Sequence, residues 1–131
     1  MTVRGLPSAW SEKDKNKHYY ESTIRKKASV ARDLGAKGII FINDTNSSNP
    51  GIIPFEGSTR EKISIQAISI NNEIRDEIFS NNDKDFYQIS KRLNKGTIEM
   101  GFSLRKFSLN CTITVKRETG SCQNTIGFMD L

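Results

Sequence analysis

The sequence is short of the side chains that most often carry catalysis or hold metals. Its 131 residues include one histidine, His18, and two cysteines, Cys111 and Cys122. A structural zinc site needs a full set of cysteine and histidine ligands, and a Ser/His/Asp or Cys/His site would have to use His18. His18 follows a run of lysines and other polar residues, which is typical of a solvated side chain at a helix start. We therefore expect no metal site and no catalytic residue in this chain.

Three further sequence signals are missing. No glycine-rich loop of the Walker or G-x-G-x-x-G type occurs, so nucleotide binding lacks its usual sequence pattern. No hydrophobic run approaches the roughly 18 residues that cross a membrane, and the longest is Gly38–Ile42. Residues 1–10 lack the apolar core of a signal peptide. The alternatives are a cytosolic protein or a piece of a longer chain.

The net charge of +5 raises the question of nucleic-acid binding. The basic residues are scattered, with acidic residues close to most of them. The densest basic run, residues 25–27, lies on a predicted helix whose other face is apolar, and no aromatic residues interleave with it. We expect no nucleic-acid partner. A basic RNA-binding domain stays as a minor alternative, which salt-dependent binding would test.

A helix and a buried strand follow one another early in the chain. Helical periodicity over residues 19–34 predicts a helix with one apolar stripe. The stripe consists of Tyr20, Ile24, Ala28, Ala31 and Leu34. Gly35 comes directly after it, where a helix often ends on a glycine with positive φ. Residues 38–43 are apolar and β-branched or aromatic, which predicts a strand buried on both faces.

Strands and helices alternate through the rest of the chain. Residues 63–70 are strand-like, and Asn71 or Asn72 then caps a helix, with Ile74 and Ile78 on one face. A second helix opens at residues 82–83, ends at Gly96, and has as inner residues Phe86, Ile89 and Leu93. Residues 107–116 alternate between apolar and polar, which predicts an antiparallel strand with one solvated face. With a first strand ending in residues 3–7, a polar loop at 8–16 and a last strand at 123–128, the pattern predicts a mixture of helices and strands.

The segment 44–62 is predicted to be a long loop, rich in turn-forming residues, with an apolar island at residues 52–55. In one interpretation Ile53 and Phe55 pack onto the core. In the other the loop is a working surface, since long loops on a rigid scaffold often carry function. Phe55 would then be an aromatic anchor, and Arg60 would pair with a peptide carboxylate in a bidentate contact that lysine cannot make.

The two cysteines leave two alternatives open. In a tight hairpin that turns at Thr119, Cys111 faces Gly127. Cys122 then faces Lys116, so the two cysteines are too far apart for a disulfide, which needs their Cα atoms within about 7 Å. A disulfide between Cys111 and Cys122 therefore requires Cys122 to leave the hairpin. Otherwise Cys111 is a small buried hydrophobic residue. Thiol titration in denaturant separates the two.

Several segments, taken in order, resemble the protease-associated (PA) domain. Residues 3–7 resemble its first strand, and residues 38–44 and 66–70 resemble two later segments. The helix pattern of that family, with its lysine, alanines and final Gly-Ala, is matched by Tyr20, Lys27, Ala28, Ala31, Gly35 and Ala36. Residues 124–127 are similar to the Asn-Val-Ile-Gly segment where zinc aminopeptidases of the glutamate carboxypeptidase and transferrin-receptor superfamily resume their catalytic domain. Thr125 replaces the usual valine.

The resemblance implies a single PA domain over residues 1–131, with 123–131 as the linker or first strand into a peptidase domain outside this chain. The implied fold is α+β, a partly closed β-sandwich or barrel flanked by helices, of the swivelling β/β/α type. The implied function is a non-catalytic lid, substrate-selecting surface or protein-interaction module of a zinc-dependent peptidase, in the first place an aminopeptidase. Zinc would belong to the catalytic domain. The implied partners are that domain and a peptide or protein substrate, and the parent would be secreted, periplasmic or membrane-anchored.

A different class of function stays open. A free-standing small α/β protein could bind a ligand or a phosphate at a helix N-terminus, such as the one that follows Asn71. A reading frame that continues into an H-x-D motif and a later Glu-Glu pair would favour the peptidase accessory domain instead.

Overall fold

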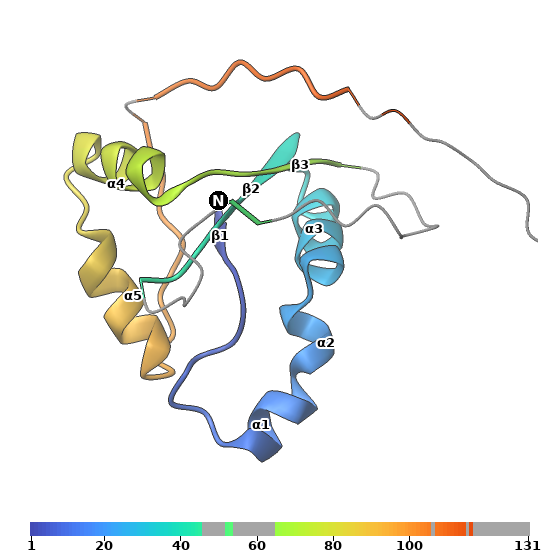
Figure 1. Ribbon diagram of the computed structural model, residues 1–131, viewed down its shortest axis with the longest axis vertical. Helices are drawn as coiled ribbons and strands as arrows, with labels where there is room; N and C mark the ends of the chain where they lie inside the picture. Colours follow the sequence, from blue (N-terminus) through green and yellow to red (C-terminus); the bar gives the residue numbers. More distant parts are fainter. Residues whose placement is uncertain (46–51, 54–64, 106, 115, 117–131) are drawn as a thin grey trace, which may run out of the picture.

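The computed structural model describes residues 1–45, 52–53, 65–105, 107–114 and 116, which build an open sheet with helices on both faces. Its strands β1 (Thr2–Val3), β2 (Gly38–Ile42) and β3 (Gln66–Ser69) run parallel in the order β1-β2-β3. The helices are α1 (Glu12–Lys17), α2 (Tyr19–Ser22), α3 (Ile24–Asp33), α4 (Asn72–Asn81) and α5 (Phe86–Asn94). In Figure 1, α4 and α5 lie to the left of the sheet, α2 and α3 to its right, and α1 below it.

Strand β2 is central and buried on both faces, which confirms the prediction from its apolar run. Ile39 and Phe41 pack against Ala28 of α3, whose side chain is fully buried. Ile42 and the half-buried Ile40 belong to a second cluster on the opposite face. The helical residues of that cluster are Phe79, Phe86, Ile89 and Leu93. Because alternate residues of a strand point to opposite faces, one short strand joins both helical layers.

The predicted helix over residues 19–34 is wrong in one respect, because Thr23 divides it into α2 and α3. Thr23 is extended, with φ −64° and ψ 146°, and its hydroxyl accepts a hydrogen bond from the amide of Lys26 at 3.2 Å. Ser11 caps α1 in the same way through the amide of Asp14, also at 3.2 Å. These hydroxyls satisfy amides that a helix start leaves unpaired. The predicted polar loop over residues 8–16 therefore contains most of α1.

The apolar stripe is confirmed only within α3. Ala28 is buried there, and Ile24 and Ala31 pack beside it. Tyr20 and Leu34 are 64% and 83% exposed. Tyr20 lies on the separate helix α2, and Leu34 lies beyond the last residue of α3. The predicted stop at Gly35 is confirmed, since its φ is +82°.

Helix α4 begins as predicted but presents a different face. Asn71 is its N-cap and accepts a hydrogen bond from the amide of Ile74 at 3.0 Å. Ile74 itself is 46% exposed, and the buried residues of α4 are Arg75 and Phe79. The guanidinium of Arg75 reaches the end of β2, and the face of α4 that carries Arg75 and Phe79 therefore points toward the core.

Helix α5 starts later than predicted. Its N-cap is Asp85, whose carboxylate accepts from the amide of Gln88 at 3.2 Å, whereas Asn82 caps the end of α4. The predicted inner residues of α5 all join the core: Phe86, Ile89 and Leu93. The predicted stop at Gly96 is confirmed, with φ +81°.

The predicted strand over residues 107–116 is wrong for the residues that the structure describes. Residues 107–114 and 116 are neither helix nor strand, and residues 107–114 run extended along the outside of the fold, at the top of Figure 1. A strand needs a neighbour for its backbone groups, and β1, β2 and β3 pair only with one another. Cys111 is exposed rather than buried.

The expected α+β fold is confirmed only as a mixture of helices and strands. The described residues form no closed barrel and no sandwich, because their one sheet is parallel and open at both edges. The strand predicted over residues 63–70 is present as β3 within its described part, and Ile53 packs onto the cluster that faces α3, as one interpretation of the long loop predicts. No helix among the described residues is long and apolar enough to span a membrane.

Candidate functional site

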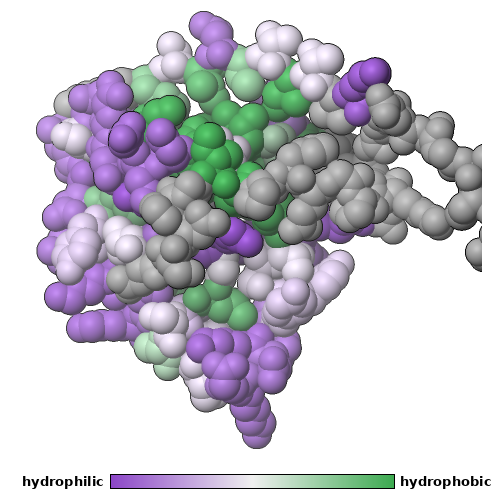
Figure 2. Space-filling model, in the orientation of Figure 1, coloured by the Kyte–Doolittle hydropathy of each residue, from purple (hydrophilic) through white to green (hydrophobic). Residues whose placement is uncertain are grey.

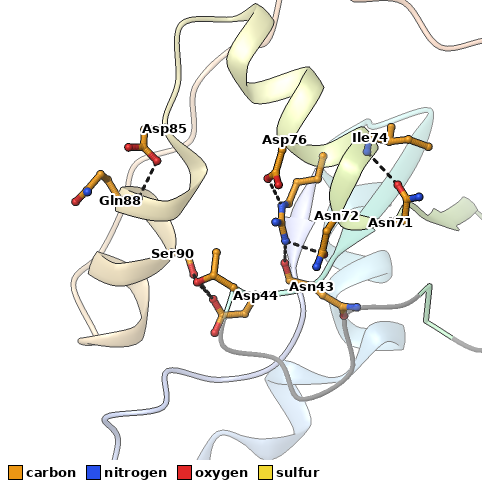
Figure 3. A network of polar contacts seen from close by, with 11 residues as sticks. Asn43, Asp44, Asn71, Asn72, Ile74, Asp76, Asp85, Gln88 and Ser90 are labelled. Carbon is orange, nitrogen blue, oxygen red and sulfur yellow. Dashed lines mark hydrogen bonds and ion pairs between the residues drawn. The ribbon is translucent and has the colours of Figure 1, made fainter.

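A group of polar side chains gathers just after β2, where the carboxyl ends of parallel strands commonly bind ligands. We call Asp44, Thr45, Ser90 and Asn94 the polar cluster. The hydroxyl of Ser90 donates to Asp44 Oδ1, and the Asn94 amide donates to Asp44 Oδ2 at 2.6 Å. Thr45 Oγ1 lies 2.8 Å from Ser90 Oγ. Ser90 and Asn94 are four residues apart on α5, so both face the same side of that helix. Figure 3 shows Asp44 and Ser90 pointing toward each other.

The polar cluster holds Asp44 in its charged form. Burial raises the pKa of this carboxyl group, but hydrogen bonds from Ser90, Asn94 and Thr45 outweigh burial and lower the pKa below its ordinary value. Hydrogen bonds that favour the carboxylate act in this direction. Asp44 is therefore charged at neutral pH and accepts the hydrogen bonds of the polar cluster.

Asn94 also fixes the segment that leads from β1 to α1. Its Oδ1 accepts from the amide of Ser8 at 3.2 Å, and its backbone carbonyl accepts from the amide of Ala9 at 3.0 Å. Two residues later, Gly96 lies so close to Trp10 that a Cβ atom there would be 2.8 Å from the indole Nε1. The start of the chain is thus fastened to the end of α5.

Arg75 joins α4 to the same end of β2. Its Nη1 donates to the carbonyl of Asn43 at 2.9 Å and to Asn72 Oδ1 at 2.8 Å, and its Nε donates to Asp76 at 2.8 Å. The guanidinium lies 4.3 Å from the ring centre of Phe86, within the range of a cation–π contact. Arg75 is only 4% exposed, so its charge serves the packing of α4 and α5.

Lys27 holds the other flank of the sheet. The amide of Arg4 donates to the carbonyl of Ile42 at 3.0 Å, so the carbonyl of Val3, one residue earlier in the extended chain, points away from β2. The ammonium of Lys27 donates to the carbonyls of Val3 and Gly5, at 2.7 and 3.1 Å. Burial lowers the pKa of Lys27. A lysine that covers a strand edge is one of the ways in which proteins protect such edges.

A cavity of about 700 Å³ lies between β1, β2, α5 and the segment after α5, to which residues 96–102, Leu104 and Phe107 belong. Its apolar lining includes Val3, Ile42 and Phe86, and its polar lining includes Lys27 and Asp44. This volume is in the range of small-molecule sites, roughly 300–1,000 Å³. Figure 2 shows hydrophobic surface gathered in the upper centre of the face that it displays.

The polar cluster is better suited to structure than to chemistry. Ser90 is only 1% exposed, so a substrate cannot reach its hydroxyl. His18 occupies the N-cap position of α2 but its side chain makes no capping hydrogen bond there, and its ring lies beside that of Trp10, with ring centres 5.3 Å apart. Within the described ranges no group of three His, Cys, Asp or Glu side chains is placed to hold a metal ion. The arrangement fixes α5, β2 and the first loop relative to one another.

The structure brings few of the predicted site residues together. Phe55, Arg60 and Cys122 lie outside the described residues, so their roles and the disulfide stay predictions. Asn71 caps its own helix, which occupies one of the amides that a phosphate would need. The sequence did not reveal Arg75, Ser90 or Asn94 as site residues. The one available signal was the i, i+4 spacing of Ser90 and Asn94 on the inner side of a predicted helix.

Comparisons with protein-family models, with curated proteins and with solved structures gave no match.

Proposed function

We propose that this chain is a non-catalytic accessory domain of the protease-associated kind, carried by a zinc-dependent peptidase, in the first place an aminopeptidase of the secretory pathway, the periplasm or the cell surface. In that setting it acts beside the active site as a lid, a substrate-selecting surface or an interaction module. The catalytic zinc belongs to the peptidase domain, and the partners are that domain and a peptide substrate.

The observation that carries the proposal is the role of the residues on which the resemblance rests. Lys27 binds the carbonyls of Val3 and Gly5, and Ala28 lets α3 lie directly on β2. Gly35 ends that helix with positive φ. These residues lie in one continuous unit that contains β1, α3 and β2. Each makes a contact or adopts a backbone conformation on which the packing of this unit depends. These roles support the proposal for the unit of β1, α3 and β2, and a fold does not by itself determine a function.

Exposed apolar residues next to this scaffold support an accessory role. Ile98 and Met100 are 88% and 83% exposed, and Phe102 is 41% exposed. They follow α5 within a few residues of one another. Apolar surface gathered in this way is typical of contact with another domain or protein. We expect it to be covered when the peptidase domain is present.

The test is peptidase activity, with and without added zinc, for this chain and for the longest reading frame that contains it. The proposal predicts zinc-dependent activity in the long form alone. Zinc-dependent activity in the 131-residue chain itself would overturn it. Inactivity of both forms would remove the peptidase assignment.

The role of the long loop is tested in the active long form. Phe55→Ala and Arg60→Ala are expected to raise KM for peptides with little change in kcat, because both residues would act in binding. Arg25→Ala, a change of the same charge on α3, is the control. Unchanged KM and unchanged peptide preference in both loop variants would take Phe55 and Arg60 out of the site.

The cavity supports a second candidate, a small apolar ligand bound by a free-standing α/β domain. Its volume of about 700 Å³ and its mainly apolar lining favour this function over phosphate binding. The fluorescent probe 1-anilinonaphthalene-8-sulfonate is a suitable first ligand. Saturable binding to the native chain that Ile42→Trp abolishes would favour this candidate, and unsaturable binding would dismiss it.

A further inference from the structure

The cavity beside β1 brings apolar core residues together with an ammonium group from the other helical layer. Phe86 and Ile89 of α5 and Ile42 of β2 line it, and all three belong to one buried cluster. Lys27 lines it as well, although α3 packs on the opposite face of β2. Its side chain reaches the cavity where it binds carbonyls of β1 and of the segment that follows. A molecule in this cavity therefore meets apolar surface and a positive charge together.

The ammonium of Lys27 is held by neutral groups. Among the described residues its acceptors are the carbonyls of Val3 and Gly5, at 2.7 and 3.1 Å. An ammonium group has three N–H donors, so a further acceptor can be bound beside these two. Burial lowers the pKa of Lys27, which means that the two carbonyls do not fully replace the water that the charge loses. An anion in the cavity would supply the missing compensation and would raise this pKa.

The carboxylates that line the same cavity are already compensated. Hydrogen bonds within the polar cluster outweigh the burial of Asp44 and lower its pKa. Glu99 also lines the cavity, and it forms an ion pair with Arg92. The lining therefore stabilises its negative charges more completely than the positive charge of Lys27. This difference favours an anionic ligand over a cationic one.

We infer that the cavity binds a small monocarboxylate with an apolar body, whose carboxylate lies on the ammonium of Lys27 and whose body packs against Ile42, Phe86 and Ile89. A hydrogen bond between two charged groups is stronger than one between neutral groups. The volume of about 700 Å³ accommodates such a molecule. An aliphatic acid and the C-terminus of a short apolar peptide share this chemistry. The inference rests on the second candidate function, the binding of a small apolar ligand in this cavity.

Isothermal titration calorimetry of the full chain with ligands of equal chain length tests the charge without any substitution. The ligands are decanoate, decanol and decylammonium, each below the concentration at which it forms micelles. We expect decanoate to bind about tenfold more tightly than decanol, as one hydrogen bond between charged groups allows, and decylammonium to bind most weakly. Acetyl-Leu-Leu and its amide form a second pair. A preference for the acid in one pair alone identifies the source of the carboxylate.

A matched pair of variants tests the position of the carboxylate. Lys27→Gln should remove the preference for decanoate over decanol and leave the affinity for decanol nearly unchanged, because the glutamine amide can still donate to a carbonyl of β1. Lys26→Gln is the control, since it removes the same charge from the neighbouring residue of α3, which does not line the cavity. In the wild type, NMR of ¹³C-labelled lysine should show that decanoate raises the pKa of Lys27 and that decanol does not. This measurement holds even if Lys27→Gln fails to fold.

The outcomes separate this inference from the function on which it rests. Saturable binding of decanol with no preference for either acid would overturn the inference and leave the second candidate function standing. Absence of saturable binding by all the ligands would overturn both. A preference for the acid that survives in Lys27→Gln would assign the carboxylate to another cation of the lining, such as Arg4, and would overturn the inference. So would a pKa of Lys27 that decanoate does not change.

Discussion

Asn94, the last residue of α5, donates its side-chain amide to Asp44, the second residue after β2, at 2.6 Å. The two residues are 50 positions apart in the chain. The same side chain accepts the amide of Ser8. One amide group therefore holds the end of the central strand, the last helix and the first loop together.

Replacement of Asn94 by aspartate should destabilise the fold strongly at neutral pH. The new carboxylate would lie beside that of Asp44 and could no longer donate to it. We expect a loss of about 2 kcal/mol in the free energy of unfolding, typical of a broken hydrogen bond to a charged group. The loss should shrink near pH ~4, where protonation of one carboxyl group removes the repulsion.

Urea denaturation at the two pH values measures this effect. The control is Asn81→Asp, at an exposed residue in the last turn of α4, which changes the net charge equally. Equal losses in the two variants would show that the contact between Asn94 and Asp44 does not hold the segments together.

Asp44 should make the stability of the fold depend on acid pH. Its pKa in the folded protein lies below the ordinary value of 3.8. Such a group stabilises the fold above the ordinary pKa, and this contribution disappears as the pH falls through the folded pKa. The stability advantage of the wild type over Asp44→Asn should therefore shrink as the pH is lowered from about 5 to about 2. Thermal unfolding across this range measures it, and parallel curves for the two proteins would contradict the prediction.

Helices and strands could be predicted from the sequence where a short-range pattern of residues was sufficient. The apolar run of β2 identified a strand buried on both faces, and the spacing of Phe86, Ile89 and Leu93 identified the inner face of α5. Helix ends were also predictable from Asn71, Gly35 and Gly96. Each of these signals lies within a few residues of the element that it defines.

The contacts that position the site could not be read in this way. Arg75 is buried because a carbonyl 32 positions earlier and the ring of Phe86 receive its guanidinium, whereas the sequence favoured the neighbouring Ile74. The alternation of residues 107–116 predicted a strand, but the described part of this segment is not one, because an alternating pattern does not supply the neighbour that a strand requires. In both cases the outcome depends on contacts between residues that are far apart in the sequence.

Gly96 and Gly35 give a matched pair for testing the contact with Trp10. Their φ angles are nearly equal, +81° and +82°, but a Cβ atom added at Gly96 would meet atoms of Trp10, whereas one added at Gly35 would meet nothing within 4 Å. Gly35→Ala should cost about 1–2 kcal/mol, the cost of a left-handed conformation for a residue with a Cβ atom. Gly96→Ala should cost more, because the methyl group also displaces the indole.

Chemical denaturation monitored by tryptophan fluorescence reports this difference, since Trp10 is the single tryptophan. The emission of folded Gly96→Ala should shift to longer wavelength as the indole moves toward water, and that of Gly35→Ala should not. Identical spectra and identical losses would show that Trp10 does not pack on Gly96 in solution.

Arg75 should be sensitive even to replacement by lysine. The planar guanidinium serves Asn43, Asn72 and Asp76 at once and stacks on Phe86. An ammonium group lacks this fork and this plane. We expect Arg75→Lys to cost about 1–3 kcal/mol of unfolding free energy, because buried acceptors lose their donor. Arg92→Lys is the control, since Arg92 pairs with Glu99 at the surface, and its loss of unfolding free energy should be much smaller.

Denaturant titration of the two variants compares their free energies of unfolding directly. Hydrogen exchange then shows which part of the fold is loosened. In Arg75→Lys we expect faster exchange confined to α4 and the end of β2. An equal response of the two variants would mean that the guanidinium does not anchor α4 to the sheet.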